Sequence, residues 1–227
     1  MTIAQLPSGR TAFNYFITSH MRLVLISDTH NDHSHMHIPE GDVLIHAGDM
    51  TENGSLAEIA AFNQWLGTLP HKHKLVIAGN HDFCLQEKEH LARSLLTNTT
   101  YLEDEAIVID GCTFYGSPWQ PEYMEMAFNL PRGTALAEKW AKIFSSTDVL
   151  ITHGPPHGIL DFTFEDKEHV GCEALSDVVM QIKPKLHVFG HVHCQHGVHL
   201  QGGMTFVNAS SCGEHLNAIW PPVVFDL

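Results

Sequence analysis

The sequence predicts an α/β protein in which two mixed sheets pack against each other. Short apolar runs typical of buried strands alternate with patterns typical of amphipathic helices, from residue 22 to the end of the chain. In the first half this alternation is regular, which predicts β-α-β units and a parallel sheet. In the second half hairpin signals appear, and they predict a second, mixed sheet packed on the first.

The first half contains three apolar runs and two segments with helical spacing. The runs predict strands at residues 22–27, 42–47 and 74–78. Apolar side chains recur every three or four positions after Leu56, as expected for one buried face of a helix. The predicted helices cover residues 56–69 and 87–96.

The second half is marked by a hairpin and by strands separated by helical segments. Asp110-Gly111 stands between two apolar runs, and an Asp-Gly pair is a strong signal for a two-residue hairpin turn. The hairpin strands are predicted at residues 106–109 and 113–116. Further strands are predicted at residues 148–152, 187–189, 205–208 and 223–226, and helices at residues 134–144 and 173–182.

One domain is expected at residues 22–227, preceded by an extension at residues 1–21. A chain of 227 residues is long enough for one sizeable core. The first 21 residues lack the apolar centre of a secretory signal, and Met21 directly precedes the first predicted strand. The extension is therefore interpreted as disordered or as not native. No run of about 18 apolar residues occurs, so no membrane span is expected.

The composition narrows the classes of function. A net charge of −14 disfavours a protein that binds long nucleic acids, although phosphate substrates remain compatible if metal ions supply positive charge. The 19 histidines are far more than usual, and histidine is the commonest side-chain metal ligand. Five cysteines without a Cys-x-x-Cys pair indicate a reduced, cytoplasmic protein.

Five short polar motifs stand at the ends of predicted strands. Ligands of open α/β sheets bind beyond the carboxyl ends of strands, so one rim is expected to gather these side chains. Carboxylate, amide and imidazole groups suit Mn, Fe, Mg or Zn, and two such ions can clamp an in-line displacement at phosphorus. The motifs are Asp28-x-His30, Gly48-Asp49, Gly79-Asn80-His81-Asp82, His153-Gly154-Pro155-Pro156 and Gly190-His191-x-His193.

Together and in this order, the motifs resemble the calcineurin-like metallophosphoesterase superfamily, whose pattern is D-x-H, G-D, G-N-H-[DE], H and G-H-x-H. Longer strings such as GDMTENG and PKLHVFGHVH are similar to the branch called metallophosphoesterase-domain-containing proteins, over roughly residues 22–227. The resemblance implies a four-layer α/β/β/α sandwich. Some animal members of that branch lack the first histidine of G-H-x-H, whereas this chain has His191 there, which implies a complete second metal site.

The resemblance also implies a role for each motif residue. One divalent ion is expected on Asp28, His30, His193 and the bridging Asp49. The other ion is expected on Asp49, Asn80, His153 and His191. A hydroxide bridging the ions would attack phosphorus, while Asn80 and the ions neutralise the developing charge. His81 would not bind metal but would protonate the leaving oxygen, so the expected catalytic residues are His81, Asn80 and Asp49.

The expected function is metal-dependent hydrolysis of small phosphodiesters such as 2′,3′- or 3′,5′-cyclic nucleotides. Mn²⁺ is the favoured ion, with Fe, Zn or Mg as alternatives, and the protein is expected to be a monomer or homodimer. Two other functions stay open. The same site could hydrolyse phosphomonoesters, including nucleotides. Alternatively, the chain could be a nucleotide-binding scaffold with little activity; loss of a metal-ligand residue from the motifs would indicate such a scaffold, and this chain has lost none.

Most singled-out residues also have a structural interpretation. Asp and Asn that follow strands often cap turns or helices, so each such residue taken alone is ambiguous. Glu52 and Asp82 could orient His81 or could be ordinary capping or solvated carboxylates. Cys194 is expected to be a buried thiol. The remaining candidates, each with an alternative as a loop or core residue, are the loop histidines His33, His35 and His37, the substrate-reaching His157, the base-stacking Trp119 and the amide Asn208.

Overall fold

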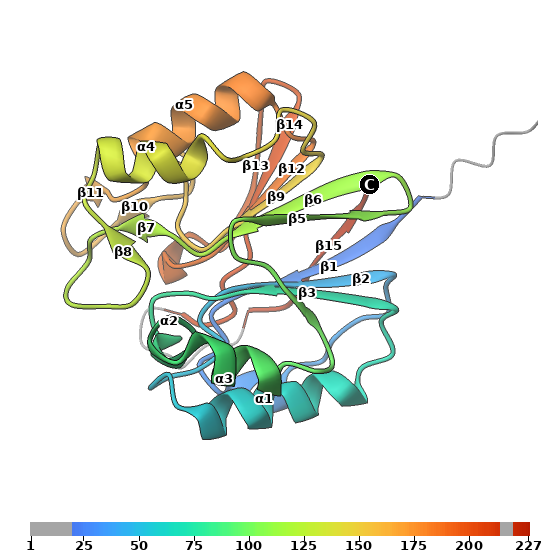
Figure 1. Cartoon of the computed structure of the whole chain (residues 1–227). Helices are drawn as coiled ribbons and strands as arrows, with labels where there is room; N and C mark the ends of the chain where they lie inside the picture. The colour runs from blue at the N-terminus through green and yellow to red at the C-terminus, as the bar shows by residue number, and fades with distance from the viewer. Residues whose placement is uncertain (1–19, 214–219) are drawn as a thin grey trace, which may run out of the picture.

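The computed structural model describes residues 20–213 and 220–227 and places two packed mixed sheets between two layers of helices (Figure 1). This architecture confirms the predicted four-layer sandwich. Of the predicted extension at residues 1–21, residues 1–19 lie outside the described residues. Within the described parts of the chain, no helix is long and apolar enough to cross a membrane.

The first sheet has the strand order β15-β1-β2-β3-β4 in the described residues. Strands β1 to β4 run parallel, and β15 pairs antiparallel with β1, so the sheet is mixed. The predicted strands of this sheet are confirmed to within a residue, and the two-residue strand β4 was not predicted. The bounds are β1 Arg22–Ile26, β2 Val43–Ala47, β3 His73–Ile77, β4 Thr100–Tyr101 and β15 Val223–Asp226.

Three helices cover the outer face of this sheet: α1 Leu56–Thr68, α2 Phe83–Glu87 and α3 Glu89–Leu95. Helix α1 begins at a capping box, in which Ser55 accepts from the Glu58 backbone and Glu58 accepts from the Ser55 backbone. The single helix predicted at residues 87–96 was only partly right. Helical structure starts at Phe83 and is interrupted at Lys88, whose φ of −131° is not helical.

The second sheet has the strand order β13-β14-β12-β9-β6-β5 in the described residues, and its outer face is covered by α4 Thr134–Trp140 and α5 Glu173–Ile182. The predicted hairpin is confirmed as β5 and β6. Helix α4 ends earlier than the predicted residue 144, because the next turns bond to carbonyls three residues back and Thr147 donates to the Phe144 carbonyl. The bounds are β5 Glu105–Ile109, β6 Cys112–Ser117, β9 Val149–Thr152, β12 Leu186–Phe189, β13 Gly197–Gln201 and β14 Met204–Asn208.

Two short strand pairs and two short 3-10 helices complete the described structure. The pairs are β7 Gln120–Pro121 with β8 Asn129–Leu130, and β10 Phe162–Thr163 with β11 Glu168–His169. The 3-10 helices are η1 Asp32–His35 and η2 His193–Gln195. Between the two large sheets lies an apolar core that includes Leu23, Leu25, Ile45, Phe114, Val188 and Val207.

Candidate metal centre

Each of the five motifs directly follows a parallel strand, and the structure brings the five strand ends together. β1, β2 and β3 of the first sheet and β9 and β12 of the second end at the same rim. The first two loops are hydrogen-bonded to each other, because the amide of Asp28 donates to the Gly48 carbonyl at 2.9 Å and that of His30 to the Asp49 carbonyl at 3.1 Å.

The backbone at this rim is turned sharply. Asp28, His30, Asp49 and His191 have φ values of 51°, 40°, 54° and 68°, in the left-handed region that residues other than glycine rarely adopt. Such conformations persist only where the surroundings enforce them, and they cluster at functional sites. Here they turn side chains at the ends of different strands toward one point.

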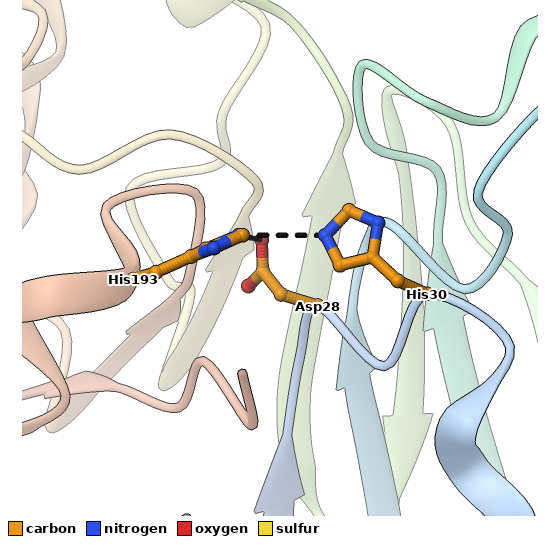
Figure 2. Close-up of side chains that lie close together, drawn as sticks. All are labelled: Asp28, His30 and His193. Atoms are coloured by element: carbon orange, nitrogen blue, oxygen red, sulfur yellow. Dashed lines mark hydrogen bonds and ion pairs between the residues drawn. The ribbon is translucent and has the colours of Figure 1, made fainter. Parts of the chain in front are cut away.

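The first cluster consists of Asp28, His30 and His193 (Figure 2). Nε2 of His193 lies 3.3 Å from a carboxylate oxygen of Asp28 and 3.4 Å from Nε2 of His30. Two ligand atoms that are each about 2.1 Å from a tetrahedral ion lie about 3.4 Å apart, and about 3.0 Å apart at right angles. The spacing of these atoms therefore fits a shared divalent ion.

The second cluster consists of Asp49, Asn80, His153 and His191. Nε2 of His153 lies 3.2 Å from Asp49 Oδ2 and 2.9 Å from Asn80 Oδ1, and Nδ1 of His191 lies 2.8 Å from Asn80 Oδ1. Nδ1 of His153 is bonded to the Ala47 carbonyl at 2.9 Å, so Nε2 is the nitrogen that faces the cluster. The distances again fit one ion.

Asp49 lies between the two clusters. Its Oδ2 is 3.2 Å from Nε2 of His153 in the second cluster and 3.8 Å from Nε2 of His30 in the first. Asp28, Asp49 and His153 also offer ligand atoms within 4.8 Å of one another. A bridging carboxylate at Asp49 is therefore compatible with the geometry.

The aspartates and histidines at this rim shift one another's pKa values. Burial alone would raise the pKa of Asp28 and Asp49, but hydrogen bonds and charges from His193 and His153 hold both pKa values low. Burial would lower the pKa of His153, but the Asp49 carboxylate raises it to about 9. A divalent ion would replace the His153 proton, so metal binding at this cluster competes with protons.

Two glycines permit the close approach of these loops. A Cβ at Gly190 would collide with the Asp28 carboxylate and the Ser27 hydroxyl, and one at Gly79 would collide with the Asp49 carboxylate. The loops can meet because both positions lack a side chain. Steric crowding thus explains why glycine is the first residue of the Gly-Asn-His-Asp and Gly-His-x-His motifs.

His81 is placed beside the clusters. Its backbone amide donates to Asp49 Oδ1 at 2.8 Å, and its Nδ1 donates to the Glu52 backbone carbonyl at 2.8 Å. Its ring also stands edge-on to the His30 ring, with centroids 4.7 Å apart. With Nδ1 engaged, Nε2 is the nitrogen available to a bound substrate.

Glu52 and Asp82 have different roles at this rim. Glu52 orients His81 through its backbone carbonyl, while its carboxylate lies 3.1 Å from Nδ1 of His30, off the line of a hydrogen bond. Asp82 accepts from the amides of Thr51 and Gly79, so its carboxylate joins the two loops and does not cap α2. Burial and the Asp49 charge raise the pKa of Asp82 to about 6.

The other loop candidates lie outside the clusters. His33 is buried against the rings of Phe62 and Trp65, because residues 32–35 form a 3-10 turn and not an extended strand. Trp119 packs on Phe128 and carries the Lys139 ammonium 3.7 Å above its ring.

Asn208 and Cys194 hold nearby loops. The Asn208 amide donates to the Val192 carbonyl at 2.9 Å, which supports its structural interpretation. Cys194 is half-buried and lines the cavity beside the clusters, whereas a buried thiol was expected. His157 is exposed and is not part of the cavity wall.

A cavity of about 330 Å³ opens onto both clusters. Asp49, Asn80 and His81 lie at its floor, and its walls include residues that the sequence analysis did not single out. Of these, Arg132 donates to the carbonyls of Val170 and Gly171, both at 2.7 Å, and thereby ties two loops together. The other newly found wall residues include Tyr123, Phe164, Glu122, Glu165 and Asp166.

The chain is similar to known sequences and structures. Residues 21–195 match the sequence profile described as calcineurin-like phosphoesterase. Metallophosphoesterase domain-containing protein 1 of Homo sapiens is 45% identical over 231 residues, which cover 91% of this chain and 71% of that protein. A UPF0046 protein of Caenorhabditis elegans is 42% identical over 222 residues, which cover 92% of this chain and 76% of that protein.

A solved structure shares the fold. The phosphopantetheinyl hydrolase of Mycobacterium tuberculosis superimposes with a TM-score of 0.61 at 16% identity, covering 88% of this chain and 92% of that one. At this identity the likeness concerns the fold alone.

Proposed function

Since the chain belongs to the calcineurin-like phosphoesterase family, in the metallophosphoesterase-domain-containing branch, we propose that it hydrolyses small phosphodiesters with two metal ions. Membership makes it a metal-dependent phosphoester hydrolase. The observation that supports the two-metal proposal is the pair of adjacent clusters with Asp49 between them. Asp28, His30 and His193 would hold one ion, Asn80, His153 and His191 the other, and Asp49 both.

The residues around the ions have separate tasks in this proposal. When bound, the two ions supply positive charge for the phosphate oxygens and acidify a water that serves as nucleophile. Asn80 offers an amide at the cavity floor that can stabilise charge developing on the phosphate. His81, fixed by the Glu52 carbonyl at Nδ1, gives the proton on Nε2 to the leaving oxygen.

The acidic wall of the cavity opposes a monoester more than a diester. Glu122, Glu165 and Asp166 line its wall, and among the described wall residues Arg132 is the only lysine or arginine. The Arg132 guanidinium is already paired with Glu173 at 2.6 Å. A phosphodiester carries one negative charge and a monoester close to two at neutral pH, so repulsion from this wall is smaller for the diester.

The volume and donor set favour small substrates and a hard ion. A cavity of about 330 Å³ is at the small end of ligand sites, which supports cyclic nucleotides over longer chains. Oxygen and imidazole donors are compatible with manganese, which we propose as the native metal. The cysteine pattern supports a reducing compartment, and we place the protein in the cytoplasm.

A hydrolysis screen of the Mn²⁺-loaded protein tests this proposal. The panel contains 2′,3′- and 3′,5′-cyclic nucleotides, bis-4-nitrophenyl phosphate, and the monoesters 4-nitrophenyl phosphate and AMP. We expect diesters to have the higher kcat/KM and a chelator to abolish turnover. Faster cleavage of the monoesters would replace the diester assignment by a phosphomonoesterase. Binding of nucleotides without turnover would indicate a scaffold.

A further inference from the structure

Two exposed aromatic side chains stand at the wall of the cavity. Tyr123 is 51% exposed and Phe164 is 61% exposed, yet both line the cavity that opens onto the metal clusters. Large exposed apolar groups beside a polar site frequently mark a ligand-binding surface.

Tyr123 is held next to the second cluster. It lies in the loop between β7 and β8, and its ring stands edge-on to the ring of His191 with centroids 5.9 Å apart. The loop is fixed to the cluster floor, because the amide of Ala127 donates to the Asn80 carbonyl at 3.1 Å. The position of the Tyr123 ring is therefore tied to the loop that carries Asn80.

Phe164 is held next to the first cluster. It follows β10, and its ring meets the ring of Phe162 with centroids 5.7 Å apart. The side-chain amide of Gln195 donates to the Phe162 carbonyl at 2.9 Å, so β10 is anchored to the loop that carries His193. Arg132 follows β8 and donates to the carbonyls of Val170 and Gly171, which follow β11, so it connects the two regions.

We propose that Tyr123 and Phe164, here called the aromatic clamp, bind a planar aromatic group of the substrate beside the phosphate. This inference rests on the proposed function and specifies its substrate class as esters with an aryl ring or a nucleobase. Aromatic side chains accept any base or aryl face by stacking, which requires no hydrogen-bonding pattern. Trp119, the stacking candidate from sequence, is packed on Phe128 and lies outside this wall.

Two substrates test the clamp; they differ only in the ester group that stays on phosphorus after the nitrophenolate leaves. Phenyl 4-nitrophenyl phosphate and methyl 4-nitrophenyl phosphate release the same 4-nitrophenolate. We expect Tyr123→Ala and Phe164→Ala to raise the phenyl-to-methyl ratio of KM values roughly fivefold or more. Tyr123→Phe and Phe164→Tyr should restore the wild-type ratio. Phe144→Ala is the matched control, because Phe144 is 55% exposed and lies outside the cavity wall. An unchanged ratio in both alanine variants overturns the clamp.

Calorimetric binding separates a failure of the clamp from a failure of the proposed function. Phenyl phosphate and methyl phosphate are titrated into the Mn²⁺-loaded protein, which requires no turnover. We expect the wild type to bind phenyl phosphate at least fivefold more tightly, and the two alanine variants to lose that preference. Equal binding of the two probes by the wild type overturns the clamp, even if diesters are hydrolysed. A preference for phenyl phosphate without diester hydrolysis retains the clamp and removes the diesterase.

Discussion

His191 and His193 are two positions apart in the chain, yet their rings face different clusters. His193 meets Asp28 and His30, whereas His191 meets Asn80. The left-handed conformation of His191 turns the loop between them, since its φ is 68°. One short loop can therefore serve two ions independently.

Replacing His191 by glycine should weaken one metal site and spare the other. His191→Gly removes one imidazole from the second cluster, while the ligands proposed for the first cluster remain in place. Calorimetric titration with Mn²⁺ should show two sites in the wild type, and one retained and one lost or weakened site in the variant. His199→Gly is the control, because His199 is an exposed histidine on β13. Equal weakening of both sites would contradict the ligand assignment.

Replacing His81 should have an effect that depends on the leaving group. A general acid contributes typically 10²–10⁴-fold, and only a strongly basic leaving group needs that proton. His81→Asn should therefore slow hydrolysis of a cyclic nucleotide, whose leaving group is a ribose alkoxide, by about 10² or more. Hydrolysis of bis-4-nitrophenyl phosphate should fall much less, because nitrophenolate departs unaided.

Metal analysis and a rate comparison check this role of His81. Both ions should remain bound in the variant, since the ring is not among the proposed ligands. Equal losses of rate on the two substrates would make His81 a phosphate-binding residue. Loss of an ion would show that the ligand assignment itself is wrong.

At the scale of elements, Gly190 is one of the two glycines that let the strand ends meet. Gly190→Ala would push a methyl group into the Asp28 carboxylate, so we expect metal affinity at the first cluster to fall at least tenfold. Gly111→Ala is the control, because an added Cβ there meets no atom within 4 Å. Unlike Gly190, Gly111 has a positive φ, 85°, so this substitution strains the backbone without touching either cluster. Mn²⁺ titration should separate the two variants, and similar affinities would exclude the steric argument.

The strands, and the loops that carry the five motifs, were predictable because each has a local signal. Apolar runs located the strands that precede the motifs, and polar residues at the run ends located the loops. Strand β13 was not predicted. Its apolar residues are exposed, and its clearest sequence signal is the hairpin turn that follows it. Gly202 and Gly203 both have positive φ values, 62° and 83°, as a two-residue hairpin turn requires. Gly-Gly before the predicted strand at residues 205–208 could have indicated that hairpin.

The cavity wall could not be predicted in the same way. Three of its residues, Tyr123, Arg132 and Phe164, lie in loops. Loops have no regular spacing of apolar residues from which a functional role could be predicted. Their proximity depends on contacts between distant segments, such as the bond from Arg132 to the Gly171 carbonyl. The boundary of α4 was missed because the amides of Lys142 and Ile143 bond to carbonyls three residues back, which the apolar spacing does not reveal.

At the scale of the whole molecule, buried histidines couple stability to pH. His187 is fully buried in the second sheet, where burial lowers its pKa to about 3. In the unfolded chain the same ring has the ordinary pKa of about 6.5. Between these values the unfolded chain binds a proton that the folded chain does not, so stability falls as pH drops from about 6.5 toward 3.

His187→Gln should flatten this dependence. One titrating group contributes about 1.4 kcal/mol per pH unit, and glutamine keeps an N–H that can donate to the Thr152 hydroxyl. Urea unfolding at pH 6.0 and pH 4.5 should show a slope smaller than the wild-type slope by about that amount. The surface variant His199→Gln serves as the control. A slope unchanged in His187→Gln would mean that the ring is protonated in the folded protein.

The two sheets meet at the metal rim, and each proposed ion has ligands on both of them. Asp28 and His30 extend from the first sheet and His193 from the second; Asn80 and His153 are divided in the same way. Each ion would thus link the two sheets of the sandwich. At a free concentration 100 times its Kd, one such ion would stabilise the fold by about 2.7 kcal/mol. A cell that runs short of the metal would then lose more than turnover, because the emptied protein would unfold and be degraded sooner. Abundance of the protein would follow the supply of the ion.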